Sequence, residues 1–145
     1  MSERSRAAVV ALGGATAVAV NLVIYGVGRA AGGTFRFTSA TGPAEVDAIT
    51  VAGFSAVPLL TGLTAVALLA PFAAWVARAA LVIGPALALG TILVMTVPTD
   101  FDKTSKAALA LCHLALVPIS IVAVRAIARR AQTIRASRAT TPSTR

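Results

Sequence analysis

Four long apolar stretches, separated by short polar segments, constrain this chain more than any other feature. They cover residues 7–28, 47–70, 78–97 and 106–126, and charged residues occur only near their ends. A helix that crosses the hydrocarbon core of a bilayer needs about 20 apolar residues. Only 12% of the residues are charged, whereas a soluble domain carries about 25%. The sequence therefore predicts an all-α integral membrane protein with a four-helix transmembrane bundle.

The polar segments divide the chain into a short head at residues 1–6, a membrane domain at 7–128 and a basic tail at 129–145. The links are short, so we expect antiparallel neighbours, and the tail is rich in Ser, Thr, Pro and Arg, which predicts disorder. The first stretch also suits a signal peptide, but it is longer than the roughly 7–15 residues of a signal core. Residues 34–38 alternate polar and apolar as a strand does, so we expect an ordered exterior loop at 29–46.

The basic residues predict the orientation of the bundle. Four spans place both termini on one side, and that side, with the second link, carries nine of the 13 basic residues. The positive-inside rule then predicts that both termini are cytoplasmic and that the protein lies in the cytoplasmic membrane. Anionic lipid headgroups are the expected partner of the basic tail, and nucleic acid is not expected. Membrane-interface anchors are expected at Trp75, Arg78, Arg125, Arg129 and Arg130.

Few polar residues lie at membrane depth, and two of them stand at the same predicted level. Asn21 and His113 are each about seven residues from the outer end of their helix, which places both roughly 10 Å below the outer surface. Tyr25 follows Asn21 by one helical turn, and Glu45 and Asp47 open the second helix at the rim. These five residues predict a small polar pocket that opens to the exterior.

Two interpretations of this group remain open. In the structural one, Asn21 and His113 form hydrogen bonds between helices and fix the bundle, since buried polar groups need partners. In the functional one, the pocket binds a ligand, or His113 exchanges protons with Glu45 or Asp47 as its partner. Cys112 is the single cysteine, and no metal-ligand cluster or phosphate-binding loop is present in the sequence, so we expect no metal and no cofactor.

Short motifs in three regions of the chain resemble one known family. The first helix contains Asn21-Leu-Val-Ile-Tyr25 and runs into Gly28-Arg-Ala-Ala-Gly32, Pro43-Ala-Glu45-Val46 precedes the second, and Leu109-Ala-Leu-Cys-His-Leu114 with Pro118 lies in the fourth. Together they resemble the DUF6069 family of actinobacterial four-helix membrane proteins, over roughly residues 7–125. The resemblance implies the architecture and draws attention to Asn21, Glu45 and His113, and it implies no biochemical activity.

A non-enzymatic accessory or binding protein of the membrane is the favoured function. Such a protein would contact itself as a homo-oligomer, a larger membrane complex, or an apolar ligand. The alternative is a small membrane enzyme or carrier for an apolar or lipid-like molecule, with its pocket around His113 and Asn21. A small multidrug exporter is disfavoured because no carboxylate lies deep in a span. A transport subunit would need a continuous polar path, for which Thr61, Thr64, Thr91 and Ser120 are the sparse candidates.

Overall fold

The structure, a computed structural model, describes residues 2–139. Four helices are long and apolar enough to cross a membrane, which is the character of a multi-pass membrane protein. Their arrangement confirms the predicted all-α bundle, to which the structure adds one small sheet. In chain order the elements are α1 (Ser2–Ala30), β1 (Arg36–Ser39), β2 (Gly42–Glu45), α2 (Ala48–Leu69), α3 (Ala74–Thr91), the π-helix η1 (Ile92–Thr96) and α4 (Lys103–Ala139).

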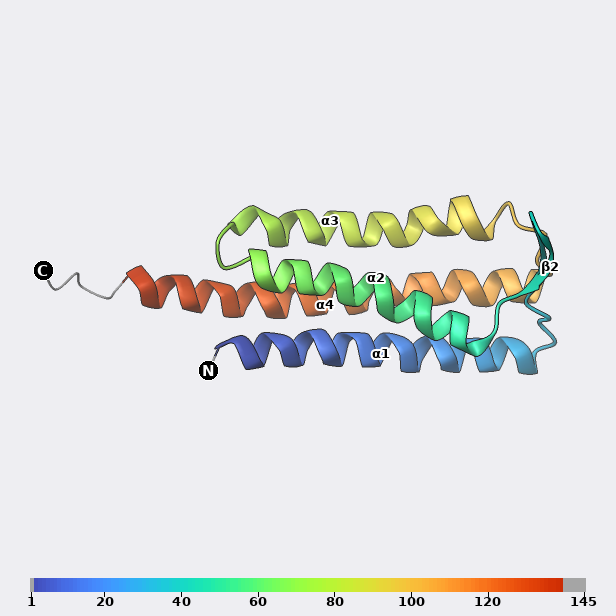
Figure 1. The fold of residues 1–145 in the computed structure, drawn as a ribbon, viewed down its shortest axis with the longest axis horizontal. Coiled ribbons are helices and arrows are strands. Elements are labelled where there is room, and N and C mark those ends of the chain that lie inside the picture. The colour runs from blue at the N-terminus through green and yellow to red at the C-terminus, as the bar shows by residue number, and fades with distance from the viewer. Residues whose placement is uncertain (1, 140–145) are drawn as a thin grey trace, which may run out of the picture.

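The helices alternate in direction along one long axis (Figure 1). The start of α1, the link between α2 and α3 and the end of α4 lie at one end of the bundle, and the two strands lie at the other. α1 packs against both α2 and α4, and α3 packs mainly against α4. α2 and α3 contact each other much less than either contacts its other neighbour. The side between α2 and α3 is therefore the most open side of the bundle.

The last helix is longer than the sequence predicted. We expected the membrane domain to end near residue 128 and the remainder to be largely disordered, but α4 continues to Ala139. The sequence after residue 128 still contains Ala, Arg, Ile and Gln, which favour helix or tolerate it well. Composition alone had marked this segment as a tail. Residues 140–145 of the predicted tail lie outside the described residues.

The loop predicted at 29–46 is ordered and forms a hairpin. β1 and β2 pair antiparallel, with Arg36 opposite Glu45 and Ser39 opposite Gly42. Phe35, directly before β1, is fully buried and has a positive φ of 56°, a conformation that a bulky residue adopts only when its surroundings hold it there. Its ring packs on Tyr25 with the centroids 4.6 Å apart, and its backbone N–H donates to Ser105 Oγ at 2.8 Å.

Two aspartates of the link between η1 and α4 clamp this hairpin onto the bundle. Asp102 accepts from the backbone N–H and the hydroxyl of Thr34, at 3.0 and 2.8 Å, and also caps α4 by accepting from Ser105. Asp100 accepts in the same way from the backbone and hydroxyl of Thr38, at 2.9 and 2.7 Å. The hairpin is thus fixed by residues that lie 68 and 62 positions away in the sequence.

The packed core occupies the half of the bundle away from the hairpin. Its buried members come from the second half of α2, the start of α3 and the distal part of α4, and Leu63 and Ile127 are its largest fully buried side chains. Residues from the start of α1, among them Val9 and Val10, pack against it. The hairpin half of the bundle holds a cavity.

Candidate functional site

A cavity of about 280 Å³ lies beneath the hairpin, between α2, η1 and α4. Its roof is formed by the hairpin region, and its walls by α2, by η1 with the link that follows, and by α4. Among the described residues, α1 contributes Asn21 alone. The lining residues are Phe37, Glu45 and Val46; Thr50, Val51, Phe54 and Ser55; Met95, Thr96, Thr99 and Phe101; Leu109, Cys112, His113 and Leu116; and Asn21.

Asn21 lines the cavity from α1, and it is only 2% exposed. Its Nδ2 donates to Ser55 Oγ at 2.7 Å, while the Ser55 hydroxyl donates to the Val51 carbonyl at 2.6 Å. Because the Ser55 proton is used in that second bond, Ser55 is the acceptor of the first, and this assigns the nitrogen of the Asn21 amide. The other amide atom, Oδ1, is buried without a hydrogen-bond partner in the described part of the chain. A buried acceptor left unpaired is costly, and native structures contain few of them.

His113 adds a polar group from α4. Its Nδ1 lies 2.8 Å from the Leu109 carbonyl oxygen, and because a carbonyl can only accept, Nδ1 carries the proton. In the neutral ring Nε2 is then an acceptor. This bond lies within α4, and among the described residues His113 makes no interhelical hydrogen bond of the kind that the structural interpretation required of it. Asn21 does make one, to Ser55 on α2.

Three of the five predicted pocket residues line the cavity, and two do not. Asn21, Glu45 and His113 are brought together. Tyr25 packs on the buried Phe35 instead. Asp47 caps α2 by accepting from the Thr50 N–H at 2.7 Å, and hydrogen bonds from the Thr50 side chain and backbone lower the pKa of this carboxyl.

Neither carboxylate is placed as a proton partner for His113. Glu45 forms ion pairs with Arg29 at 2.9 Å and with Arg36 at 3.3 Å. In the described part of the chain neither Glu45 nor Asp47 hydrogen bonds to the His113 ring. Within residues 2–139 no group of three His, Cys, Asp or Glu side chains is arranged to hold a metal ion.

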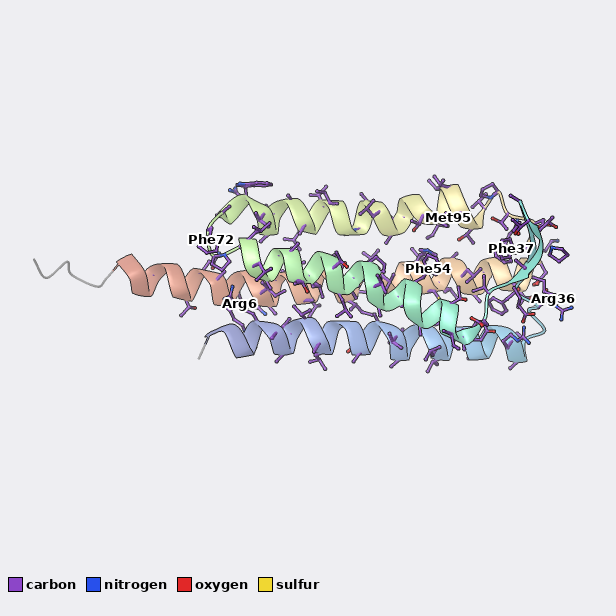
Figure 2. The ribbon with its side chains drawn as sticks, viewed as in Figure 1. Arg6, Arg36, Phe37, Phe54, Phe72 and Met95 are labelled. Atoms are coloured by element: carbon purple, nitrogen blue, oxygen red, sulfur yellow. The ribbon has the colours of Figure 1, made fainter. Side chains whose placement is uncertain are left out.

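Sequence reasoning missed the side of the cavity formed by α2 and η1. Phe54 is 70% and Met95 57% exposed on the outside of the bundle, yet both line the cavity. Figure 2 shows them at the same level along the bundle. They mark a lateral opening between α2 and η1, on the side where these helices contact least. π-helical turns occur often at functional sites, but the run Ile92–Thr96 carries no sequence signal that would distinguish it from an ordinary helix.

The predicted interface anchors lie at the end of the bundle away from the hairpin. Trp75 is 64% exposed in the first turn of α3, and Arg78 is exposed one turn later. Arg125, Arg129 and Arg130 are exposed along the distal part of α4. An exposed tryptophan beside arginines at a helix end is typical of a membrane–water interface.

Comparison with known proteins identifies the family of this chain, and that family has no known function. No curated protein and no solved structure matches the chain. Residues 1–131, which include all the residues of the cavity, match the family of unknown function DUF6069. The chain belongs to the DUF6069 family.

Proposed function

We propose that this protein is a non-enzymatic binding protein of the cytoplasmic membrane, and that it holds a small, mostly apolar molecule in the cavity beneath the hairpin. The observation that carries the proposal is the buried Asn21 Oδ1, which has no partner within residues 2–139 and belongs to a residue lining the cavity. Binding sites for small molecules usually have a mostly apolar wall with a small number of polar groups. A ligand hydroxyl or N–H that displaces the atoms covering Oδ1 would give this acceptor its missing hydrogen bond.

The chemistry of the lining defines the ligand class. Asn21 Oδ1 is an acceptor without a partner in the described part of the chain, and in the neutral ring His113 Nε2 is another, so a ligand with a hydrogen-bond donor fits them. Phe37, Phe54 and Phe101 supply aromatic surface for an apolar body. The volume of about 280 Å³ lies just below the roughly 300–1,000 Å³ of sites for drug-sized molecules. The ligand is therefore smaller than these, or it is one end of a longer molecule that extends between Phe54 and Met95.

Binding is favoured over proton transfer because the two nearby carboxylates already have other partners. Glu45 is held by two arginines, and Asp47 caps α2. A catalytic or proton-coupled role for His113 would require one of them to leave these partners. The enzyme of the alternative interpretation has no comparable supporting contact among the described residues.

The orientation of the bundle is part of this proposal. The end of the bundle that bears the arginine-rich segments is cytoplasmic, as the positive-inside rule favours, and the hairpin and cavity face the outer leaflet. A Thr41→Cys variant should then react with a membrane-impermeant maleimide in intact cells, whereas Phe72→Cys should react only after the cells are opened. Labelling of Phe72→Cys alone in intact cells would reverse the orientation.

In the proposed orientation the basic distal part of α4 meets anionic headgroups, and the exposed apolar faces leave room for a homo-oligomer or a larger complex.

The cavity can be tested with 2-naphthol and naphthalene, which share a ring system and differ by one hydroxyl donor. Cys112 lines the cavity and is the single cysteine, so an occupied cavity should slow its alkylation by N-ethylmaleimide. One hydrogen bond is worth about 0.5–1.5 kcal/mol net, which is a preference for naphthol of about two- to tenfold. Asn21→Leu should keep the protection by naphthalene and lose this preference. Equal protection by both probes in the wild-type protein would refute the proposal.

A further inference from the structure

Thr96, the last residue of η1, lines the cavity beneath the hairpin and is only 4% exposed. Two other hydroxyl side chains are buried in the described part of the chain, those of Ser55 and Ser105, and both donate hydrogen bonds. Within residues 2–139 the Thr96 hydroxyl has no hydrogen-bond partner. Burial of an unpaired hydroxyl costs free energy, and native structures contain few such groups. Thr96 therefore calls for a partner from outside the chain.

The π-helical turn accounts for this unpaired hydroxyl. In an α-helix a threonine hydroxyl can donate to the carbonyl three or four residues back, as Thr91 does to Leu87 at 3.0 Å. In η1 the backbone bonds reach five residues back, as from the Val97 N–H to the Ile92 carbonyl at 2.9 Å. The carbonyls are thus shifted from the places that an α-helix gives them. The turn leaves Thr96 with both a donor and an acceptor for another molecule.

The charges around the cavity favour an uncharged partner. Apart from the neutral His113, Glu45 is the one acidic or basic residue in the lining that the structure describes, and it is already paired with Arg29 and Arg36. An ionic ligand would be buried there without a counter-ion, which is costly. A hydroxyl group suits the lining better, because it can accept from the Thr96 hydroxyl and donate to His113 Nε2.

The lateral opening of the cavity lies next to Thr96. Met95 precedes Thr96 in η1, and together with Phe54 on α2 it lines the cavity while its side chain is exposed on the outside of the bundle. Both residues belong to helices that are long and apolar enough to cross a membrane. A hydrocarbon chain attached to a hydroxyl at Thr96 can therefore leave the cavity sideways, into the bilayer.

We propose that the cavity binds a neutral long-chain alcohol of the bilayer, whose hydroxyl pairs with Thr96 and whose chain passes between Phe54 and Met95. This inference rests on the proposed function. Of the two ligand shapes considered there it selects the longer one, and it assigns to Thr96 the recognition of the polar end.

The test compares dodecanol with dodecane, which share a chain and differ by the hydroxyl, as protectors of Cys112 against alkylation by N-ethylmaleimide. Thr96→Val keeps the shape of the side chain and removes its hydroxyl. It should weaken protection by dodecanol about two- to tenfold, as the loss of one hydrogen bond predicts, and leave protection by dodecane unchanged. Thr96→Ser should restore the protection by dodecanol.

A matched control is Thr99→Val, because Thr99 also lines the cavity but its hydroxyl already donates to the Met95 carbonyl. This variant should be protected by dodecanol as the wild-type protein is. The assignment of Thr96 is wrong if dodecanol protects Thr96→Val and Thr99→Val equally. It is also wrong if Thr96→Val weakens protection by dodecanol and dodecane alike, since Thr96 would then only shape the cavity.

The path of the chain is tested with octanol and hexadecanol at equal mole fractions in the detergent micelle. A chain that leaves through the opening should allow equal protection by both alcohols. Protection by octanol alone would mean that the chain is confined within the cavity of about 280 Å³, and it would overturn the proposed path. A preference for 2-naphthol over naphthalene with no effect of Thr96→Val would overturn the alcohol and leave the proposed function standing. Absence of protection by every one of these probes would overturn both.

Discussion

Replacement of Asn21 by leucine should leave the bundle as stable as before or make it more stable, although it removes a buried hydrogen bond between helices. The bond from Nδ2 to Ser55 Oγ is worth about 0.6 kcal/mol on average, and at most about 1.7, among hydrogen bonds measured between membrane helices. The same change removes the unpaired Oδ1, whose burial costs about 1–3 kcal/mol. With the average value of the bond, the sum is a change of about 0.4–2.4 kcal/mol in favour of the folded state.

Ser55→Ala supplies the contrast, because it removes the acceptor and leaves the donor. Both polar atoms of the Asn21 side chain would then be buried without a partner. We expect this variant to unfold about 1–3 kcal/mol more easily. In the double variant, Asn21→Leu with Ser55→Ala, there is no amide donor that needs Ser55 as its acceptor. The effects of the two substitutions on stability should therefore not add.

The free energy of unfolding can be measured by titrating the protein in mixed micelles with dodecyl sulfate and following helix content. The two single variants should change it in opposite directions. A loss of more than about 1.7 kcal/mol in Asn21→Leu would refute the reasoning, because Asn21 would then be held by interactions in the bundle and not kept for a ligand.

Two further predictions concern the hairpin end of the bundle. A Cβ atom on Gly28 would lie 2.8 Å from both Ala108 Cβ and Phe35 Cζ, so Gly28→Ala should destabilise the bundle by about 1–3 kcal/mol in the same titration, whereas Gly26→Ala, with nothing within 4 Å, should be neutral or slightly stabilising. The donors on Ser105, and after them those on Thr34, hold the pKa of Asp102 well below its ordinary value; the carboxylate clamp is therefore intact above about pH 4 and weakens only as the pH falls toward that lowered pKa. The rate of hydrogen exchange at the Thr34 amide, corrected for its intrinsic rate, should not change between about pH 5 and 8, and it should be higher in Asp102→Asn. A titration midpoint of this rate inside that pH range would contradict the lowered pKa of Asp102.

The four spans, and the level of Asn21 with His113, could be predicted because both depend on local periodicity. An apolar run long enough to cross a bilayer gives the helix, and a rise of 1.5 Å per residue gives the depth. The same rule placed Tyr25 on the face of Asn21, but it could not show that Phe35 would fill the space beside Tyr25. That contact depends on the hairpin, which folds back over the end of α1.

The remaining parts of the site depend on contacts between distant segments. The clamp joins Thr34 to Asp102 and Thr38 to Asp100, and neither pairing follows from spacing. The opening at Phe54 and Met95 depends on how α2 and η1 diverge. Both side chains read in the sequence as ordinary apolar residues of a span, because lipid-facing and cavity-facing positions use the same residue types.

The distribution of packing along the bundle bears on the choice between a binding site and a conduit. In the half away from the hairpin, Leu63 and Ile127 are 2% and 0% exposed within a continuous apolar core. Polar groups at membrane depth mark the paths of ions and polar substrates, and in this half Arg6, at the start of α1, is the one buried polar residue among those that the structure describes. In the hairpin half, Asp100 and Asp102 hold the roof over the cavity while α2 and η1 separate at the side. A molecule that enters between Phe54 and Met95 meets the packed half below and the clamped hairpin above, so it leaves by the way it entered. This is the behaviour of a reversible binding site, and it is why we favour that function over transport.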